Sequence, residues 1–306
     1  MKKTAALVLA LLAAAPAGAV PDLPGFSAGV FQSFGTDKYR GTDVYAAASL
    51  GDFSVAPELR RYEETGLNGP RLAASLRLGW DGRWIGTGLS GGFLPRKAGY
   101  DASFLGADVA FTVSPMGEGK IRRVGGPSRG GAPVGKGLAR VDFGGGALVT
   151  QHREAGTVAR ASSKLTQTEL NAFVGASVVG VLASARLAKY AYNADMLNNA
   201  LNLPSPLWSP LAGHLRYANG FADTSLNLGV ELPFFPLVTP FLGATYTKYK
   251  ELSVAAGGRP GDTKAYTAGL RVGLEMLALE AQFQHVAQAG PAKERNYAGL
   301  GAQLRL

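Results

Sequence analysis

The stretch that decides the fold runs from Phe221 to Lys250, FADTSLNLGVELPFFPLVTPFLGATYTKYK. In its first part, apolar residues such as Leu226 and Leu228 alternate with small or polar residues. After the apolar corner at 234–236 the alternation restarts and continues toward the end of the stretch. Strand side chains point alternately to opposite faces, so this pattern predicts two strands, each with one apolar and one polar face, joined as a hairpin.

The N-terminus has the layout of a cleavable secretory signal peptide. Two lysines precede an apolar run over residues 5–15, and a small-residue site follows at 17–19. We therefore expect residues 1–19 to be a signal peptide that is cleaved near Ala19, and residues 20–306 to form one domain. The apolar run is shorter than the roughly 20 residues of a membrane helix. Because the chain has no cysteine, it can form neither a disulfide nor a lipoprotein anchor.

Composition favours a β-barrel among the exported folds. Glycine accounts for 42 of 306 residues, hydrophobic residues for 46% and charged residues for 17%, and period-two segments recur along the chain. We expect about fourteen strands, with twelve or sixteen as alternatives, because bacterial single-chain barrels have an even number. The predicted strands lie near 25–34, 43–51, 52–62, 70–80, 83–94, 100–114, 137–150, 165–179, 180–191, 221–234, 237–250, 263–276, 277–288 and 296–306.

The last predicted strand keeps apolar residues at alternate positions up to the end of the chain. It resembles the C-terminal assembly signal of outer-membrane barrel proteins, although it ends in Leu306 where an aromatic residue is usual. With the signal peptide and the alternating strands, the chain resembles the Gram-negative outer-membrane β-barrel proteins as a class. This resemblance implies an all-β, antiparallel transmembrane β-barrel in the outer membrane. It also implies outer-membrane lipid, lipopolysaccharide and the barrel-assembly machinery as partners.

Connections and aromatic residues support the same orientation. Short connections such as Gly51-Asp52 and Asp81-Gly82 are typical of periplasmic turns, although the long segment 115–136 breaks this rule. All eleven tyrosines lie at or near the predicted outer strand ends or in outer loops, so we expect them at the membrane–water boundary. These tyrosines are Tyr39, Tyr45, Tyr62, Tyr100, Tyr190, Tyr192, Tyr217, Tyr246, Tyr249, Tyr266 and Tyr297.

If the apolar columns face lipid, the polar columns face the lumen. The predicted lumen-lining residues are Arg77, Arg140, Asp142, Glu169, Arg186, Asp223, Glu231, Arg271, Glu275 and Arg305. Two alternatives are open at this stage: these charges pair inside a filled barrel, or they line a water-filled pore. Glycines on the same face, including Gly273, Gly299 and Gly301, leave space and favour a pore, unless they serve only to ease strand curvature.

The net charge of the chain bears on ion selectivity, and one outer connection bears on the width of the pore. The net charge of +9 falls to 9 − 2 = +7 without Lys2 and Lys3, which suggests a mild anion preference. An exported barrel is not expected to bind nucleic acid despite this charge. The connection 191–220 contains Asn198, Leu203 and Trp208, and it either folds inward as a constriction or packs against the rim.

We do not expect an enzyme. His285 is a possible general base of a lipid-modifying hydrolase, but no serine lies near it in the sequence, and a base needs a nucleophile within reach. No metal-ligand cluster and no cofactor motif stands out, so we expect neither metal nor cofactor. The sequence therefore favours a passive, porin-like channel for small hydrophilic solutes. The alternative is a structural or surface-interaction barrel without an open pore.

Overall fold

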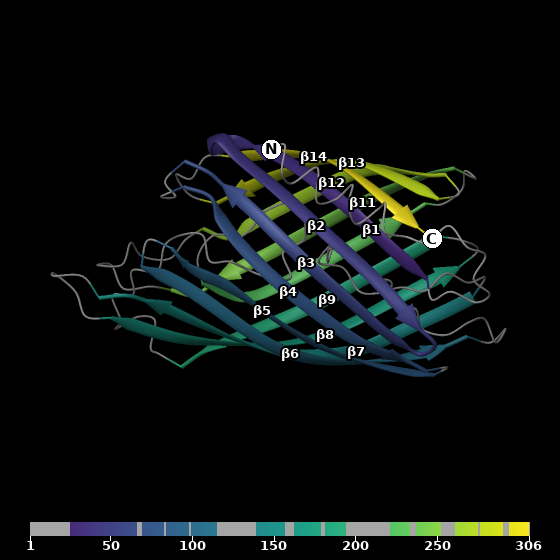
Figure 1. Ribbon diagram of the computed structural model, residues 1–306, viewed down its shortest axis with the longest axis horizontal. Helices are drawn as coiled ribbons and strands as arrows, with labels where there is room; N and C mark the ends of the chain where they lie inside the picture. The colour runs from purple at the N-terminus through teal and green to yellow at the C-terminus, as the bar shows by residue number, and fades with distance from the viewer. Residues whose placement is uncertain are drawn as a thin grey trace.

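Strands of the described chain close into one barrel (Figure 1). The computed structural model describes residues 25–65, 69–82, 84–97, 99–114, 139–156, 162–178, 181–193, 221–232, 237–251, 261–274, 276–289 and 294–305. The fourteen strands in these ranges are β1 (Phe26–Gly35), β2 (Tyr39–Leu50), β3 (Phe53–Glu63), β4 (Arg71–Asp81), β5 (Ile85–Lys97), β6 (Tyr100–Val113), β7 (Ala139–Glu154), β8 (Ser163–Val178), β9 (Val181–Tyr192), β10 (Ala222–Glu231), β11 (Val238–Tyr249), β12 (Thr263–Gly273), β13 (Leu277–Gln288) and β14 (Arg295–Arg305).

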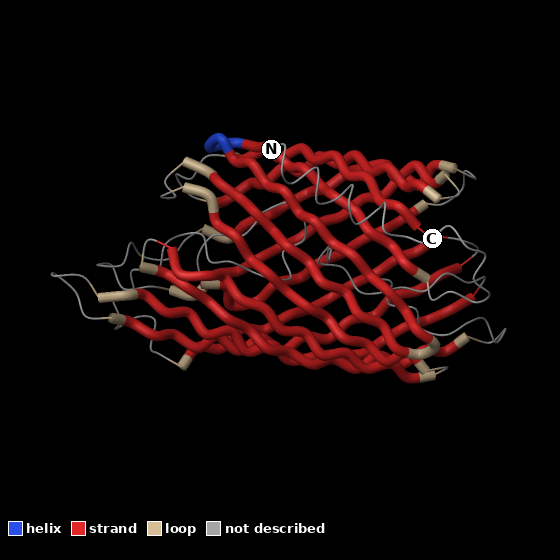
Figure 2. Tube along the Cα trace, in the orientation of Figure 1, coloured by secondary structure: helices blue, strands red, loops and turns tan. Residues whose placement is uncertain are grey.

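Each strand pairs antiparallel with its neighbours in sequence, and the β1–β14 pair closes the ring. Ser27 lies opposite Arg305, so the start of β1 and the end of β14 lie at the same end of the barrel. We call this the terminal end, and the opposite end, which carries the short helical turn η1 (Thr36–Lys38), the far end. Figure 2 shows that strand makes up nearly all of the described chain.

The prediction of a closed antiparallel barrel of about fourteen strands is confirmed. The main differences in strand bounds lie at the far end, where β2 begins at Tyr39 instead of residue 43 and β7 continues to Glu154 instead of residue 150. These strands are longer because backbone pairing continues past the apolar alternation, with Tyr100 opposite Glu154 as one example. Within the described residues, no helix is long and apolar enough to cross a membrane.

The hairpin of β10 and β11 shows how the two faces are arranged. Leu226 and Leu228 are 37% and 48% exposed, whereas Ser225 and Asn227 between and beside them are only 4% exposed. The apolar column therefore points out of the barrel and the polar column points in. A soluble sandwich would bury the apolar column between its sheets, so this arrangement suits a barrel surrounded by lipid.

Candidate functional site

Charged residues of the inner wall form groups that link neighbouring strands. Arg140 and Asp142 are two residues apart on β7, and both are buried on its inward face. The Arg140 Nε donates to both carboxylate oxygens of Asp142 at 3.0 Å. The Thr112 hydroxyl of β6 donates to the same carboxylate at 2.5 Å. The pair thus compensates both buried charges and ties β6 to β7.

Two further pairs lie nearer the middle of the barrel. The Arg77 guanidinium of β4 donates to the Asp108 carboxylate of β6 at 2.7 Å, reaching across β5. Arg186 of β9 forms an ion pair with Glu169 of β8, and the same carboxylate accepts a hydrogen bond from the Asn171 amide at 3.1 Å. The predicted residues Arg77, Arg186 and Glu169 are therefore engaged in pairs that cross from strand to strand.

Arg271 of β12 lies between two carboxylates toward the terminal end. Its guanidinium is 3.3 Å from Glu231 of β10 and 3.3 Å from Glu280 of β13. The guanidinium carbon also lies 5.9 Å from the centre of the Phe241 ring. Three strands are thus joined around one cation, and two of these residues, Arg271 and Glu231, belong to the predicted set.

A similar group between β2 and β3 was not among the residues we predicted. Arg60 contacts Asp43 at 2.8 Å and Glu58 at 2.9 Å. The signal was present in the sequence, because Glu58 and Arg60 flank Leu59, which is 48% exposed on the outer face. Alternation alone therefore assigns these charges to the inside. Asp108 was missed in the same way.

A tyrosine cluster lies on the inner wall toward the far end, in the same half as the group of Arg60, Asp43 and Glu58. Tyr39, Tyr62, Tyr100 and Tyr297 are buried in one cluster with Phe31. The rings of Tyr39 and Tyr297 make an edge-to-face contact with 5.3 Å between their centroids. These tyrosines lie near the far strand ends as predicted, but not at the membrane–water boundary, because the strand register points them into the barrel.

Two of the inward glycines do not provide open space. A Cβ atom built on Gly299 or Gly301 would approach the Phe31 ring to 2.2 Å or 2.7 Å, so the ring lies over both glycines. The interpretation that these glycines widen a pore is therefore wrong at this position. Gly273, near the terminal end, has nothing within 4 Å of such an atom. Gly269, also in the terminal half, lies under the Phe241 ring, so inward glycines serve aromatic packing in both halves, and Gly273 is the one of these four that leaves open space.

Comparisons with known proteins agree in fold but not in sequence. No family model matches the chain, and no curated protein resembles it in sequence. Similar solved structures include the KdgM porin in complex with disordered oligogalacturonate (7% identity, TM-score 0.42, covering 91% of this chain and 98% of that chain). Another is the NanC porin (8%, 0.44, 91% and 100%). A third is OmpT, an outer membrane protein of Vibrio cholerae (10%, 0.42, 95% and 100%). At these identities the likeness concerns the fold alone.

The decisive observation is a closed ring of strands with large apolar side chains exposed around its outside. The chain is an outer-membrane-type β-barrel. The inner wall of this β-barrel, with its ion-paired groups and its tyrosine cluster, is the candidate functional site.

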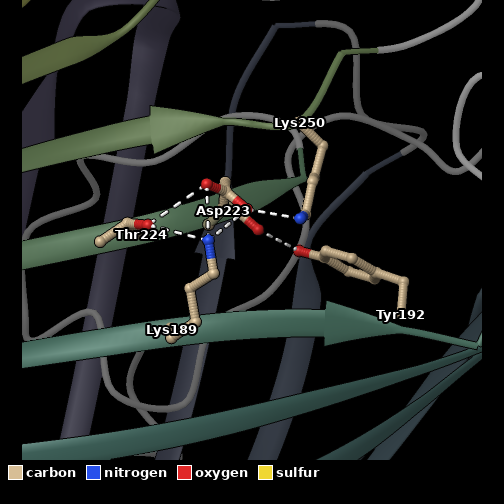
Figure 3. Close-up of polar contacts among 6 residues, drawn as sticks. Lys189, Tyr192, Asp223, Thr224 and Lys250 are labelled. Atoms are coloured by element: carbon tan, nitrogen blue, oxygen red, sulfur yellow. Dashed lines mark hydrogen bonds and ion pairs between the residues drawn. The ribbon is translucent and has the colours of Figure 1, made fainter.

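An irregularity in β10 separates Asp223 from the other residues predicted to line the lumen. The pairing with β11 shifts between Ala222 and Thr224, so the inward–outward alternation does not extend to Asp223. Its carboxylate binds the Lys189 ammonium at 2.9 Å and also pairs with Lys250 (Figure 3). Because the Lys189 side chain is 61% exposed and lies between two buried neighbours, this group belongs to the far rim. The prediction for Asp223 is corrected accordingly.

The histidines of the β-barrel do not assemble a hydrolytic site in the described residues. His152 is fully buried in β7, within 2.8 Å of the Tyr100 hydroxyl and 3.3 Å of Gln167. His285 lies 2.9 Å from the Asn296 side chain and contacts no serine or threonine hydroxyl there. This pair provides a base and an orienting group without a nucleophile.

Several predicted residues lie outside the described ranges: Glu275 and the possible constriction residues Asn198, Leu203 and Trp208. Arg305 pairs with Ser27 through the backbone at the terminal end of β14. Across the described ranges, no group of three or more His, Asp or Glu residues is arranged to hold a metal ion.

Proposed function

We propose that this β-barrel is a passive outer-membrane channel for small hydrophilic solutes. The observation that carries the proposal is the set of ion pairs on the inner wall, which bridge strands in both halves of the barrel. Charged groups such as Arg271, Glu231 and Glu280 are the kind of side chains that hold water in a pore. A ring of fourteen strands lies between filled eight-stranded barrels and open porins of 16 to 18 strands.

Single-channel recording in planar lipid bilayers tests this proposal. We expect discrete openings of the purified protein, with a small conductance because the tyrosine cluster narrows the far half. Tyr297→Ala removes a buried inward ring and should raise the conductance. Phe34→Ala removes a ring of the outer face, which is 49% exposed, and should leave the conductance unchanged. If neither the wild-type protein nor the Tyr297→Ala variant showed channel openings, the proposal of an open channel would be refuted.

The proposed channel is weakly selective. The anion preference suggested by the net charge finds no support in the ion-paired groups, because Arg60, Arg77, Arg140, Arg186 and Arg271 each contact a carboxylate. Paired charges leave little net field along a pore. Reversal potentials measured across a salt gradient should therefore lie close to zero. A large shift of either sign would contradict this part of the proposal.

A closed structural barrel is the second candidate. It is favoured by the buried far-half cluster, in which Phe31, Tyr39 and Tyr297 come from β1, β2 and β14 and pack together. Such a protein would act through its surface, without conductance. The recordings described above separate the two candidates directly.

The location and the absence of catalysis belong to the same proposal. Cleavage near Ala19 is tested by N-terminal sequencing of the protein recovered from outer membranes. Deletion of residues 194–212 tests whether the connection that includes Asn198, Leu203 and Trp208 restricts the pore, since a restricting segment would raise conductance on removal. Phospholipid incubated with the protein should release no fatty acid, and release that His285→Ala abolishes would instead indicate a hydrolase.

A further inference from the structure

Among the side chains that the structure describes, the basic residues of the outer face lie only at the far end. Seven exposed Lys or Arg residues lie there, each at an outward position of a different strand: Arg40, Arg61, Arg153, Lys164, Lys189, Lys248 and Lys264. Lys248 lies between the buried Thr247 and Tyr249, and Lys264 lies between the buried Thr263 and Ala265. Their neighbours point inward, so these lysines point outward. We call these seven residues the basic belt.

The outer face at the terminal end has a different character. It presents Leu50 (74% exposed), Phe53 (65%), Val178 (57%) and Met276 (56%). No Lys or Arg with a described side chain points outward there. The two ends of one continuous surface therefore differ, and that difference matches a membrane with an anionic headgroup layer on one side.

The strands β11 and β12 show a graded sequence from the belt toward the barrel middle. On β12, the outward positions run from Lys264 through Tyr266 (53% exposed) to Leu270 (50%). On β11, they run from Lys248 through Tyr246 (40%) to Leu242 (57%). Tyr246 lies directly opposite Lys264. From the far end toward the middle of the barrel, a charged side chain is followed by an amphipathic ring and then by an apolar side chain. This is the order of the lipid headgroups, the interface and the acyl chains in a membrane.

Like charges approach one another within the belt. Arg153 and Lys164 are directly opposite on β7 and β8, and Lys189 and Lys248 are both opposite Thr224. Like charges directly opposite each other, such as Arg153 and Lys164, repel, and an anion between them offsets the repulsion. Lys164, Lys248, Lys264 and Arg40 form no ion pair with the described residues, whereas Lys189 pairs with Asp223, Arg61 with Glu63 and Arg153 with Asp101.

We propose that the basic belt binds the phosphate groups of the outer-leaflet glycolipid, lipopolysaccharide, and that Lys248 and Lys264 above Tyr246 and Tyr266 form its best-defined position. The proposal rests on the outer-membrane location given under the proposed function. The lysines contact phosphate, the tyrosine rings lie at the sugar level, and Leu242 and Leu270 contact acyl chains. A basic residue near an anionic lipid surface contributes a factor of about five in binding.

The experiment titrates the full-length mature protein in detergent micelles with bisphosphorylated lipid A and with the same lipid after removal of its phosphates. We expect the wild type to bind the phosphorylated form more tightly. The double variant Lys248→Gln/Lys264→Gln should bind that form about 25-fold more weakly, the product of two such factors. The control Lys38→Gln/Lys97→Gln also removes two positive charges at the far end, but it leaves the seven residues of the basic belt unchanged. It should retain wild-type binding.

Two results would overturn the proposal. Equal weakening by the belt variant and the rim control would reduce the effect to overall charge. Wild-type binding that ignores the phosphates would assign recognition to the acyl chains alone. Heat-modified electrophoretic mobility verifies that each variant is folded. Conductance recorded in phospholipid bilayers free of lipopolysaccharide separates the two proposals, because channel openings without phosphate-dependent binding refute only the lipid site, and binding without openings refutes only the channel.

Discussion

The two halves of the inner wall share one strand alternation and both carry ion pairs, such as Arg60 with Asp43 in the far half, but the tyrosine cluster lies in the far half. Toward the terminal end, Arg140 pairs with Asp142 and Arg271 lies between two carboxylates. Toward the far end, Tyr39, Tyr297 and Phe31 pack in a buried cluster. Alternation thus determines only which face a residue takes. The kind of residue on that face determines whether the interior is polar and paired or apolar and packed.

The two halves also have different sensitivities to substitution. A buried ion pair is costly to break, since the remaining charge is left without compensation. A packed aromatic cluster is instead sensitive to changes in volume and shape. Stability measurements on variants of each half therefore test the distinction between them.

We expect the largest effect from Asp142→Ala in the terminal half. The substitution leaves Arg140 buried without its carboxylate and should lower the free energy of unfolding by about 3–5 kcal/mol. The free energy is measured by urea titration of the folded protein in lipid vesicles, with tryptophan fluorescence as the signal. Asp223→Ala, in the solvent-exposed rim group, should cost less than about 1 kcal/mol. Equal losses would mean that the inner wall is no more sheltered than the rim.

A smaller effect is expected from Gly299→Ala in the far half. The new methyl group would enter the space of the Phe31 ring and should destabilise the protein by about 1–3 kcal/mol. Gly273→Ala is the matched control in the terminal half, where nothing lies within 4 Å of the new atom. It should be neutral or stabilise by roughly 0.4–1 kcal/mol. If the same unfolding titration gave equal changes in the free energy of unfolding for both variants, the expected difference between the two positions would be refuted.

Next in size is Tyr100→Phe, which tests the polar contacts of the far half. It removes the 2.8 Å hydrogen bond between the Tyr100 hydroxyl and the His152 Nδ1. The loss should be about 0.5–1.5 kcal/mol, because a buried hydrogen bond contributes that much on balance. Tyr266→Phe removes a hydroxyl from the exposed outer face and should leave the free energy of unfolding unchanged. No loss in Tyr100→Phe would indicate that water replaces the bond and that this half is open to solvent.

The barrel itself could be predicted because its signal is local and repeated. Period-two alternation gave the strand number and the inward face of Arg140, Asp142 and Glu169. It failed at Asp223, where one extra residue in β10 interrupts the register, and a bulge leaves no clear trace in composition.

The pairing between inward residues could not be read from the sequence. Arg77 reaches Asp108 across an intervening strand, and Phe31 covers glycines of β14 that are more than 250 positions away. Such contacts depend on the register of strands that meet only when the barrel closes. The tyrosines of the far cluster illustrate the same limit, because Tyr39, Tyr100 and Tyr297 lie near the strand ends as predicted, while their inward face required the register.

The smallest effect is expected on ion selectivity, from Glu231→Gln combined with Glu280→Gln. Both substitutions keep the shape of the side chains but free the Arg271 guanidinium of its two carboxylate partners. A single unpaired cation in the terminal half should move the reversal potential slightly toward anion preference in a conducting pore. The shift should shrink in 1 M salt, where the screening length falls to about 3 Å. Glu63→Gln removes one negative charge at the far end, beside Arg61, and should produce no shift. If both variants shifted the potential equally, selectivity would arise at the far mouth, and the ion pairs of the terminal half would serve only to hold the strands together.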